Sequence, residues 1–119
     1  MKIAVASSGK TLDALVDGRF GRASGFIVYD LENDTFTVAD NLQNLNAAQG
    51  AGIQAAQNVA ETGAGAVIAP SFGPKAFSVL KAAGVKAFIS SVVTVQDAIE
   101  EYKSGKLTES VAANVEGHW

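Results

Sequence analysis

The chain has no cysteine and a single histidine, His118, next to the last of its 119 residues. Disulfide bonds, thiolate nucleophiles and zinc or iron–sulfur sites built on protein thiolates are therefore excluded, and so is a metal site with several histidines. Basic residues are also few, because nine Lys and Arg stand against twelve Asp and Glu, for a net charge of −3. General nucleic-acid binding requires a positive surface, so this balance argues against it.

Long apolar runs are lacking as well. No stretch approaches the ~18 to 20 continuous apolar residues that a membrane-spanning helix requires. The first apolar run, residues 2–6, reaches Ser7 and Gly9 too soon to form the apolar core of a secretion signal. We therefore expect a cytoplasmic protein. Hydrophobic residues nevertheless make up 48% of the chain, which is enough for the core of one domain of ordinary size.

Apolar runs and helical periodicities alternate along the chain. They predict strands at residues 2–6, 26–29, 35–39, 66–69 and 85–89, the second and third joined as a hairpin. They predict helices at about residues 47–62, from Pro74 to Gly84, and from a cap at Thr94 to Gly105. This order indicates a single α/β domain with a mixed five-stranded sheet flanked by helices. The residues from Lys106 onward have weak periodicity, and we expect them to be loosely attached.

Gly9-Lys10-Thr11 has the sequence that ends a phosphate-binding P-loop, and it follows a predicted strand. A P-loop also needs a glycine five residues before Gly9, but that position is Ala4, inside the strand. We therefore interpret Ser7 to Thr11 as a flexible turn at the carboxyl end of the first strand. Ligands of open α/β sheets favour crevices at such ends.

Two further loops are predicted to meet at that edge of the sheet. Residues 17–25 contain two arginines, whose planar donor forks suit anions, and three glycines, which allow close backbone approach. Residues 69–75 lead into a helix whose N-terminal N–H groups and partial positive charge favour an anion, with Phe72 as an apolar wall and Lys75 as added charge. The alternatives are an ordinary turn with solvated arginines and Phe20 in the core, and a helix start with nothing bound.

Four of the nine basic residues lie in these three loops. Positive charge gathered at one crevice of an acidic protein suggests an anionic small ligand. The candidate binding residues are Ser7, Lys10, Arg19, Phe20, Gly21, Arg22, Ser71, Phe72, Gly73, Pro74 and Lys75. Another loop, residues 41–50, is either a plain connection or a source of ligand-binding amides.

Catalytic residues are not evident. His118 lies too near the end of the chain to pair with a serine in the folded body, and the first strand lacks the Asp that a two-metal nuclease needs. Asp30, Asp34 and Asp40 lie at the ends of the predicted hairpin, where turn formation explains them. We therefore expect no enzymatic activity.

Several segments, in this order and spacing, resemble the dinitrogenase iron–molybdenum cofactor biosynthesis family, which contains NifX-like proteins and the C-terminal domain of NifB-like proteins. They are residues 3–7, 17–23, 26–30, 49–52, 63–68, 73–77 and 80–86. The resemblance extends to about Leu107, which defines a domain at 1–107 and a C-terminal tail at 108–119. It implies a ribonuclease-H-like fold and the binding or transport of molybdenum–iron cofactors or their precursors, without turnover. Size and layout place the chain near the orange-protein branch, which is associated with a sulfide-bridged molybdenum–copper cluster.

Two positions depart from the family pattern. Many members have histidine where this chain has Arg19 and Gln49, so the resemblance does not imply protein-to-metal bonds here. A preassembled anionic sulfide cluster, held non-covalently by Arg19, Arg22, Lys75 and helix N–H groups, suits the residues better. The resulting hypothesis is a carrier for a molybdenum-containing metal–sulfur cluster that works with other proteins of a cofactor pathway. The alternatives are a regulatory or protein-interaction module that binds no cluster, and an enzyme acting on a phosphorylated metabolite.

Overall fold

The computed structural model describes residues 1–41 and 51–111. Six strands in this part of the chain form one mixed sheet in the order β3-β2-β1-β4-β5-β6. β1, β4 and β5 are parallel to one another, whereas β2, β3 and β6 run antiparallel to their neighbours. The strands are β1 Lys2–Ser7, β2 Gly25–Asp30, β3 Thr35–Asp40, β4 Ala66–Ala69, β5 Lys86–Ile89 and β6 Thr108–Glu109.

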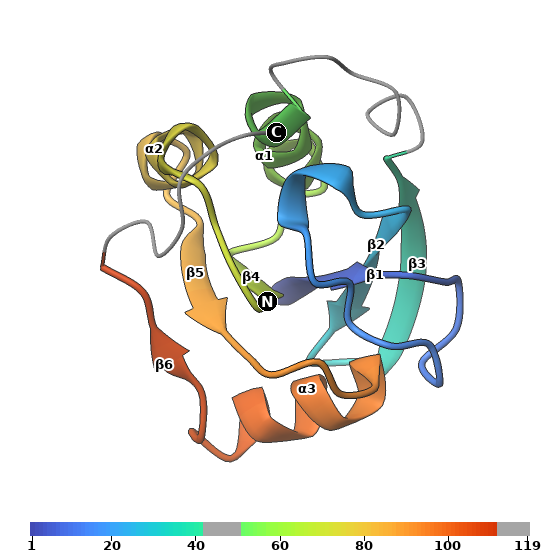
Figure 1. Cartoon of the computed structure of the whole chain (residues 1–119). Helices are drawn as coiled ribbons and strands as arrows, with labels where there is room; N and C mark the ends of the chain where they lie inside the picture. Colours follow the sequence, from blue (N-terminus) through green and yellow to red (C-terminus); the bar gives the residue numbers. More distant parts are fainter. Residues whose placement is uncertain (42–50, 112–119) are drawn as a thin grey trace.

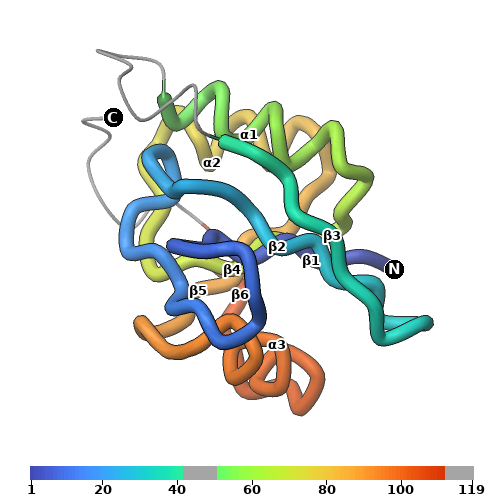
Figure 2. Tube along the Cα trace, turned by 90° about the vertical axis from the view of Figure 1, so that its right-hand side faces the viewer, coloured from blue at the N-terminus to red at the C-terminus, as the bar shows by residue number. Residues whose placement is uncertain are grey.

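Helices cover both faces of the sheet. α1 (Ala51–Glu61) and α2 (Pro74–Ala82) lie on one face, and α3 (Val95–Lys103) lies on the other (Figures 1 and 2). The predicted caps are confirmed: Thr94 Oγ1 accepts a hydrogen bond from the Asp97 N–H at 3.1 Å, and Pro74 occupies the first turn of α2. Glycines with positive φ follow each helix, at positions 63, 84 and 105. None of the described helices has the length and hydropathy needed to cross a membrane.

The single α/β domain is confirmed, but the prediction of five strands is wrong. Thr108 and Glu109 form a sixth strand that pairs with Ile89 and Phe88. This strand has only two residues, both exposed, so it leaves no alternating pattern in the sequence. It also extends the sheet beyond Leu107, where the domain was predicted to end. Residues 47–50 of the first predicted helix, Gln49 among them, and residues 112–119 with His118 lie outside the described residues.

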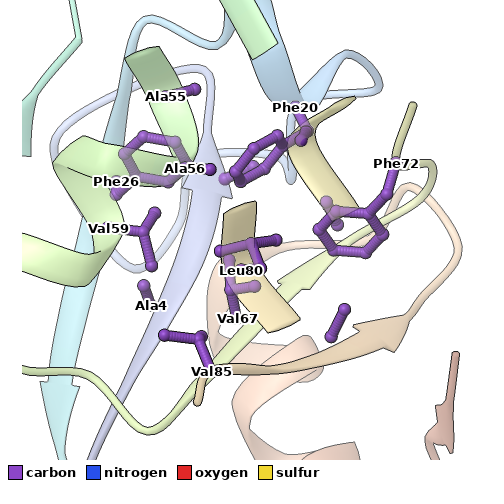
Figure 3. Packing of buried hydrophobic residues seen from close by; sticks show 14 of the residues in the cluster. Ala4, Phe20, Phe26, Ala55, Ala56, Val59, Val67, Phe72, Leu80 and Val85 are labelled. Atoms are coloured by element: carbon purple, nitrogen blue, oxygen red, sulfur yellow. The ribbon is translucent and has the colours of Figure 1, made fainter. Parts of the chain in front are cut away.

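The sheet separates two apolar cores. Ala4 and Ala6 of β1 face the α1 and α2 side, whereas Ile3 and Val5 face the α3 side. A central strand that is buried on both faces reads as a continuous apolar run, as residues 2–6 do. Figure 3 shows the larger core beneath α1 and α2, where three phenylalanine rings lie in a row.

Candidate functional site

The predicted loops lie at the carboxyl ends of the parallel strands in the middle of the sheet. β1 ends at Ser7 and β4, its neighbour, ends at Ala69. The chain leaves β1 toward β2 on one side and leaves β4 toward β5 on the other. This divergence creates a switch point, the place where open α/β sheets commonly bind ligands. Residues 8–24 and 70–73 therefore border the switch point of the sheet.

Aromatic packing and one hydrogen bond hold these two loops together. The rings of Phe20 and Phe72 have centroids 5.1 Å apart, and Phe26 contacts Phe20 at 5.4 Å (Figure 3). The Ser71 hydroxyl donates to the carbonyl oxygen of Gly18 at 3.1 Å. All three rings are fully buried. Phe20 therefore lies in the core, as the alternative interpretation of its loop expected. Phe72, which was predicted to form an apolar wall for a ligand, is buried beneath the loops and not exposed at their surface.

The two arginines lie at either end of one short turn. η1 (Phe20–Arg22) is a 3₁₀ helix that packs against α1, and its Arg22 N–H bonds to the Arg19 carbonyl at 3.2 Å. Asp17 accepts the Arg19 backbone N–H at 3.0 Å, which fixes the entry to the turn. The side chain of Arg19 is exposed, that of Arg22 is half-buried, and Gly21 between them is buried. The turn thus carries two cations on a backbone that these hydrogen bonds hold in place.

The start of α2 adds a third cation and a helix N-terminus. Gly73 is the N-cap residue in extended conformation, with no side-chain hydrogen bond to the cap, and the first turn has no acidic residue. Pro74 and Lys75 are exposed, whereas Gly73 is buried. The partial positive charge of the helix end is therefore not compensated by an acidic residue of that turn. We call Arg19, Arg22, Ser71, Lys75 and this helix end the cation site, because cationic groups form it; its expected ligand is an anion.

Ser7 and Lys10 are placed differently from the other candidates. Ser7 is fully buried, and its hydroxyl bonds to both the carbonyl and the N–H of Gly9, at 2.7 and 3.2 Å. Lys10 is exposed at a cavity of about 330 Å³, which is lined by Ser8, Gly9, Lys10, Ser24, Gly25, Val38 and Asp40. The arginines and Lys75 do not line this cavity. The structure thus joins two of the three predicted loops through direct contacts and places the first beside a separate cavity.

A partly buried amide network supports the cation site, and the sequence did not single it out. Asn41 is fully buried, and its Nδ2 donates to the carbonyl oxygen of Ala23 at 2.9 Å. The Asn58 side chain of α1 donates to Asn41 Oδ1 at 2.7 Å, and Gln54 donates to Asn58 at 3.1 Å. The network links the end of η1 to α1. An asparagine at the end of a strand is the only sequence signal for it.

The described residues contain no group of three His, Cys, Asp or Glu side chains that could hold a metal ion. The cation site offers N–H donors and positive charge, which fit the surface of an anion.

Residues 1–105 match the dinitrogenase iron–molybdenum cofactor family, and the chain belongs to that family. Its structure is similar to that of the apo form of the orange protein from Desulfovibrio gigas, with 40% identity, a TM-score of 0.93 and 96% of each chain covered. A NifB-type protein from Thermotoga, solved by NMR, has 38% identity and a TM-score of 0.84 over 98% of each chain. An uncharacterized protein of Methanocaldococcus jannaschii is 29% identical over 109 residues, which cover 90% of this chain and 89% of that one.

Proposed function

We propose that the chain is a non-enzymatic carrier for an anionic molybdenum-containing metal–sulfur cluster, either a molybdenum–copper sulfide or a precursor of the iron–molybdenum cofactor. Family membership and the similarity to the orange protein suggest a role in cluster binding or cofactor biosynthesis. The carrier role, the identity of the cluster and its site are the steps that we add. The ribonuclease-H-like kinship and the cytoplasmic location remain predictions, and the proposal does not depend on them.

The observation that carries the proposal is the cation site itself. Ser71 and the Phe20–Phe72 contact join the loops that bear Arg19 and Lys75. An arginine fork can donate two N–H groups to the edge of an anion, and the N-terminus of α2 adds its positive end. Each exposed contact near a helix end contributes only ~0.3 to 1 kcal/mol. Binding is therefore expected to be modest and to weaken as added salt screens the charges.

The metal ligands that the chain can offer determine the form in which the metal is carried. The chain has no cysteine, so it supplies no thiolate to a metal. Sulfide already bonded to the metals takes that role, and the protein contacts the outer surface of the cluster. Release to a partner then breaks only hydrogen bonds and ion pairs, which suits a carrier.

Uptake by the protein purified without oxygen tests the proposal. The protein is mixed with tetrathiomolybdate and a copper(I) salt, passed through a desalting column, and assayed for molybdenum, copper and visible absorption. We expect coloured protein with bound molybdenum, and less of it at high salt. A protein that retains no molybdenum refutes the carrier role and favours the module that binds no cluster.

A parallel sample receives molybdate, the oxoanion without sulfide. If the protein retains as much molybdate as it retains molybdenum from the sulfide-containing mixture, the site binds oxoanions in general. That result would favour the alternative hypothesis of an enzyme acting on a phosphorylated metabolite. Preference for the sulfide-bridged form supports the carrier.

A further inference from the structure

The two arginines of the cation site are supported by different parts of the fold. Arg19 comes directly before Phe20, whose ring is fully buried and packs against Phe26 and Phe72. Arg22 lies at the other end of η1. Its position therefore depends on how the chain is held after this turn.

Asn41 clamps the chain directly after Arg22. Its side-chain Nδ2 donates to the carbonyl oxygen of Ala23 at 2.9 Å, and its backbone N–H donates to the carbonyl oxygen of Ser24 at 3.3 Å. Asn41 is fully buried, so its side-chain bond forms away from water, where a polar group without its partner is costly. Two bonds from one residue thus hold the end of η1 at which Arg22 lies.

The helix α1 in turn fixes the side chain of Asn41. Asn58 Nδ2 donates to Asn41 Oδ1 at 2.7 Å, and Gln54 Nε2 donates to Asn58 Oδ1 at 3.1 Å. All donors of the amide network therefore point the same way, from α1 toward η1. With its amide rotated by 180°, Asn41 would direct an oxygen at the Ala23 carbonyl oxygen and an N–H group at the Asn58 N–H group, and neither pair can bond. The two neighbours thus select the same orientation of the Asn41 amide.

The two arginines differ in how much they depend on this clamp. Arg19 is exposed, so rotation about its side-chain bonds can offset a small shift of the backbone. Arg22 is half-buried, and neighbouring atoms restrict its side chain, so a shift of η1 displaces its guanidinium. A binding group keeps its geometry where packing and surrounding hydrogen bonds lock it. Asn41 and Asn58 supply such bonds next to Arg22.

We propose that Asn41 and Asn58 are positioning residues for Arg22. They hold the end of η1 so that the Arg22 guanidinium meets the anion, and they act through this arginine and not on the ligand. The inference rests on the proposed function, in which Arg22 binds the cluster. Loss of the amide network then weakens binding through Arg22 and leaves the contribution of Arg19 intact.

A cycle of variants in the uptake assay tests this dependence on Arg22. Asn58→Leu removes the donor to Asn41 and keeps a side chain of similar size. With tetrathiomolybdate and copper(I) as the probe, its uptake should be about two- to fivefold weaker, as expected for the loss of one exposed contact near a helix end. The substitution should have no further effect in an Arg22→Ala protein and its full effect in an Arg19→Ala protein. No loss at all, or the same loss in both backgrounds, overturns the proposal, because a network that only stabilised the fold would act on both alike.

Two further variants keep this test decisive. Gln57→Leu is the matched control, because Gln57 is the exposed neighbour of Asn58 on α1 and makes none of the bonds of the network. Its uptake should equal that of wild type. If Asn58→Leu unfolds, Gln54→Leu takes its place, and it should weaken uptake only when Arg22 is present.

NMR of the cluster-free protein separates failure of this inference from failure of the carrier role. Asn58→Leu should shift the Nε–H resonance of Arg22 and speed amide hydrogen exchange at Ala23, whose N–H bonds to the Phe20 carbonyl. The Nε–H resonance of Arg19 should stay in place. Unchanged signals of Arg22 and Ala23 overturn the positioning role. A wild type that retains no molybdenum refutes the carrier role, and these signals alone then decide whether the network positions Arg22.

Discussion

The contact between Phe20 and Phe72 predicts an energetic coupling between the two loops of the cation site. Both rings are fully buried, with centroids 5.1 Å apart at an interplanar angle of 47°. Truncating either ring to alanine would cost about 3 to 5 kcal/mol, a large share of the ~5 to 15 kcal/mol that stabilises a domain. Leucine is the better substitution, because it keeps most of the apolar volume and removes the ring–ring contact.

A double-mutant cycle measures that contact. Wild type, Phe20→Leu, Phe72→Leu and the double variant are unfolded in urea, and the free energies of unfolding are compared. Tilted aromatic pairs contribute about 0.5 to 1.5 kcal/mol beyond their buried area. We expect the double variant to lose less stability than the sum of the single losses by that amount.

A matched cycle supplies the control. Phe88 belongs to the opposite core and packs edge-on against Tyr102, with centroids 5.1 Å apart. Phe72 and Phe88 therefore lie in cores on opposite faces of the sheet, and the losses from Phe72→Leu and Phe88→Leu should add within about 0.3 to 0.5 kcal/mol. If the losses from Phe20→Leu and Phe72→Leu add as fully as those of the control pair, the two loops are not coupled through their rings. That result would refute the claim that the Phe20–Phe72 contact holds the loops of the cation site together.

Three further predictions concern single contacts. Hydrogen bonds from Tyr29 and Lys103 lower the pKa of Asp34, so its contribution to stability is complete above the unfolded pKa of about 3.9 and is lost as pH falls through the folded value. Asp34→Asn should therefore be less stable than wild type at pH 7 in urea unfolding, with the gap closing near pH 2; a constant gap argues against this. Ser71→Ala should lose ~0.5 to 1.5 kcal/mol with its bond to Gly18, and an unchanged urea midpoint would show that the bond contributes nothing. Thr94→Ala should lose about 1 kcal/mol of helix capping, whereas Thr94→Ser should retain it in thermal unfolding.

Local rules account for the parts of the fold that were predicted correctly. Pro74, Thr94 and the glycines that follow the helices act within a few residues of their own positions, so their signals are complete in the sequence. The central strands read as apolar runs because both of their faces are buried. The family resemblance, carried by loop residues such as Arg19 to Ala23, agrees with the match of residues 1–105.

The features that sequence reasoning missed depend on long-range contacts. β6 exists because Thr108 and Glu109 meet the free edge of β5. Asn41 is buried because it meets a carbonyl group 18 residues earlier and a helix 17 residues later. Lys10 and the arginines are close in sequence, but only the fold shows that Lys10 lies at a cavity that the arginines do not line. Such pairings have no local pattern from which to predict them.

Cluster uptake by two charge-matched variants tests the central claim most directly. Arg19→Ala with Arg22→Ala removes two cations of the cation site. Lys2→Ala with Lys86→Ala removes two exposed cations from the amino ends of β1 and β5, at the opposite end of these strands from the cation site. Both variants should first show wild-type unfolding midpoints within error.

The measurement is molybdenum retained per chain across a titration with tetrathiomolybdate and copper(I). Two lost contacts of ~0.3 to 1 kcal/mol each predict about three- to thirty-fold weaker uptake by the arginine variant. The lysine variant should match wild type. Equal uptake by all three proteins would contradict the assignment of the cluster to the cation site.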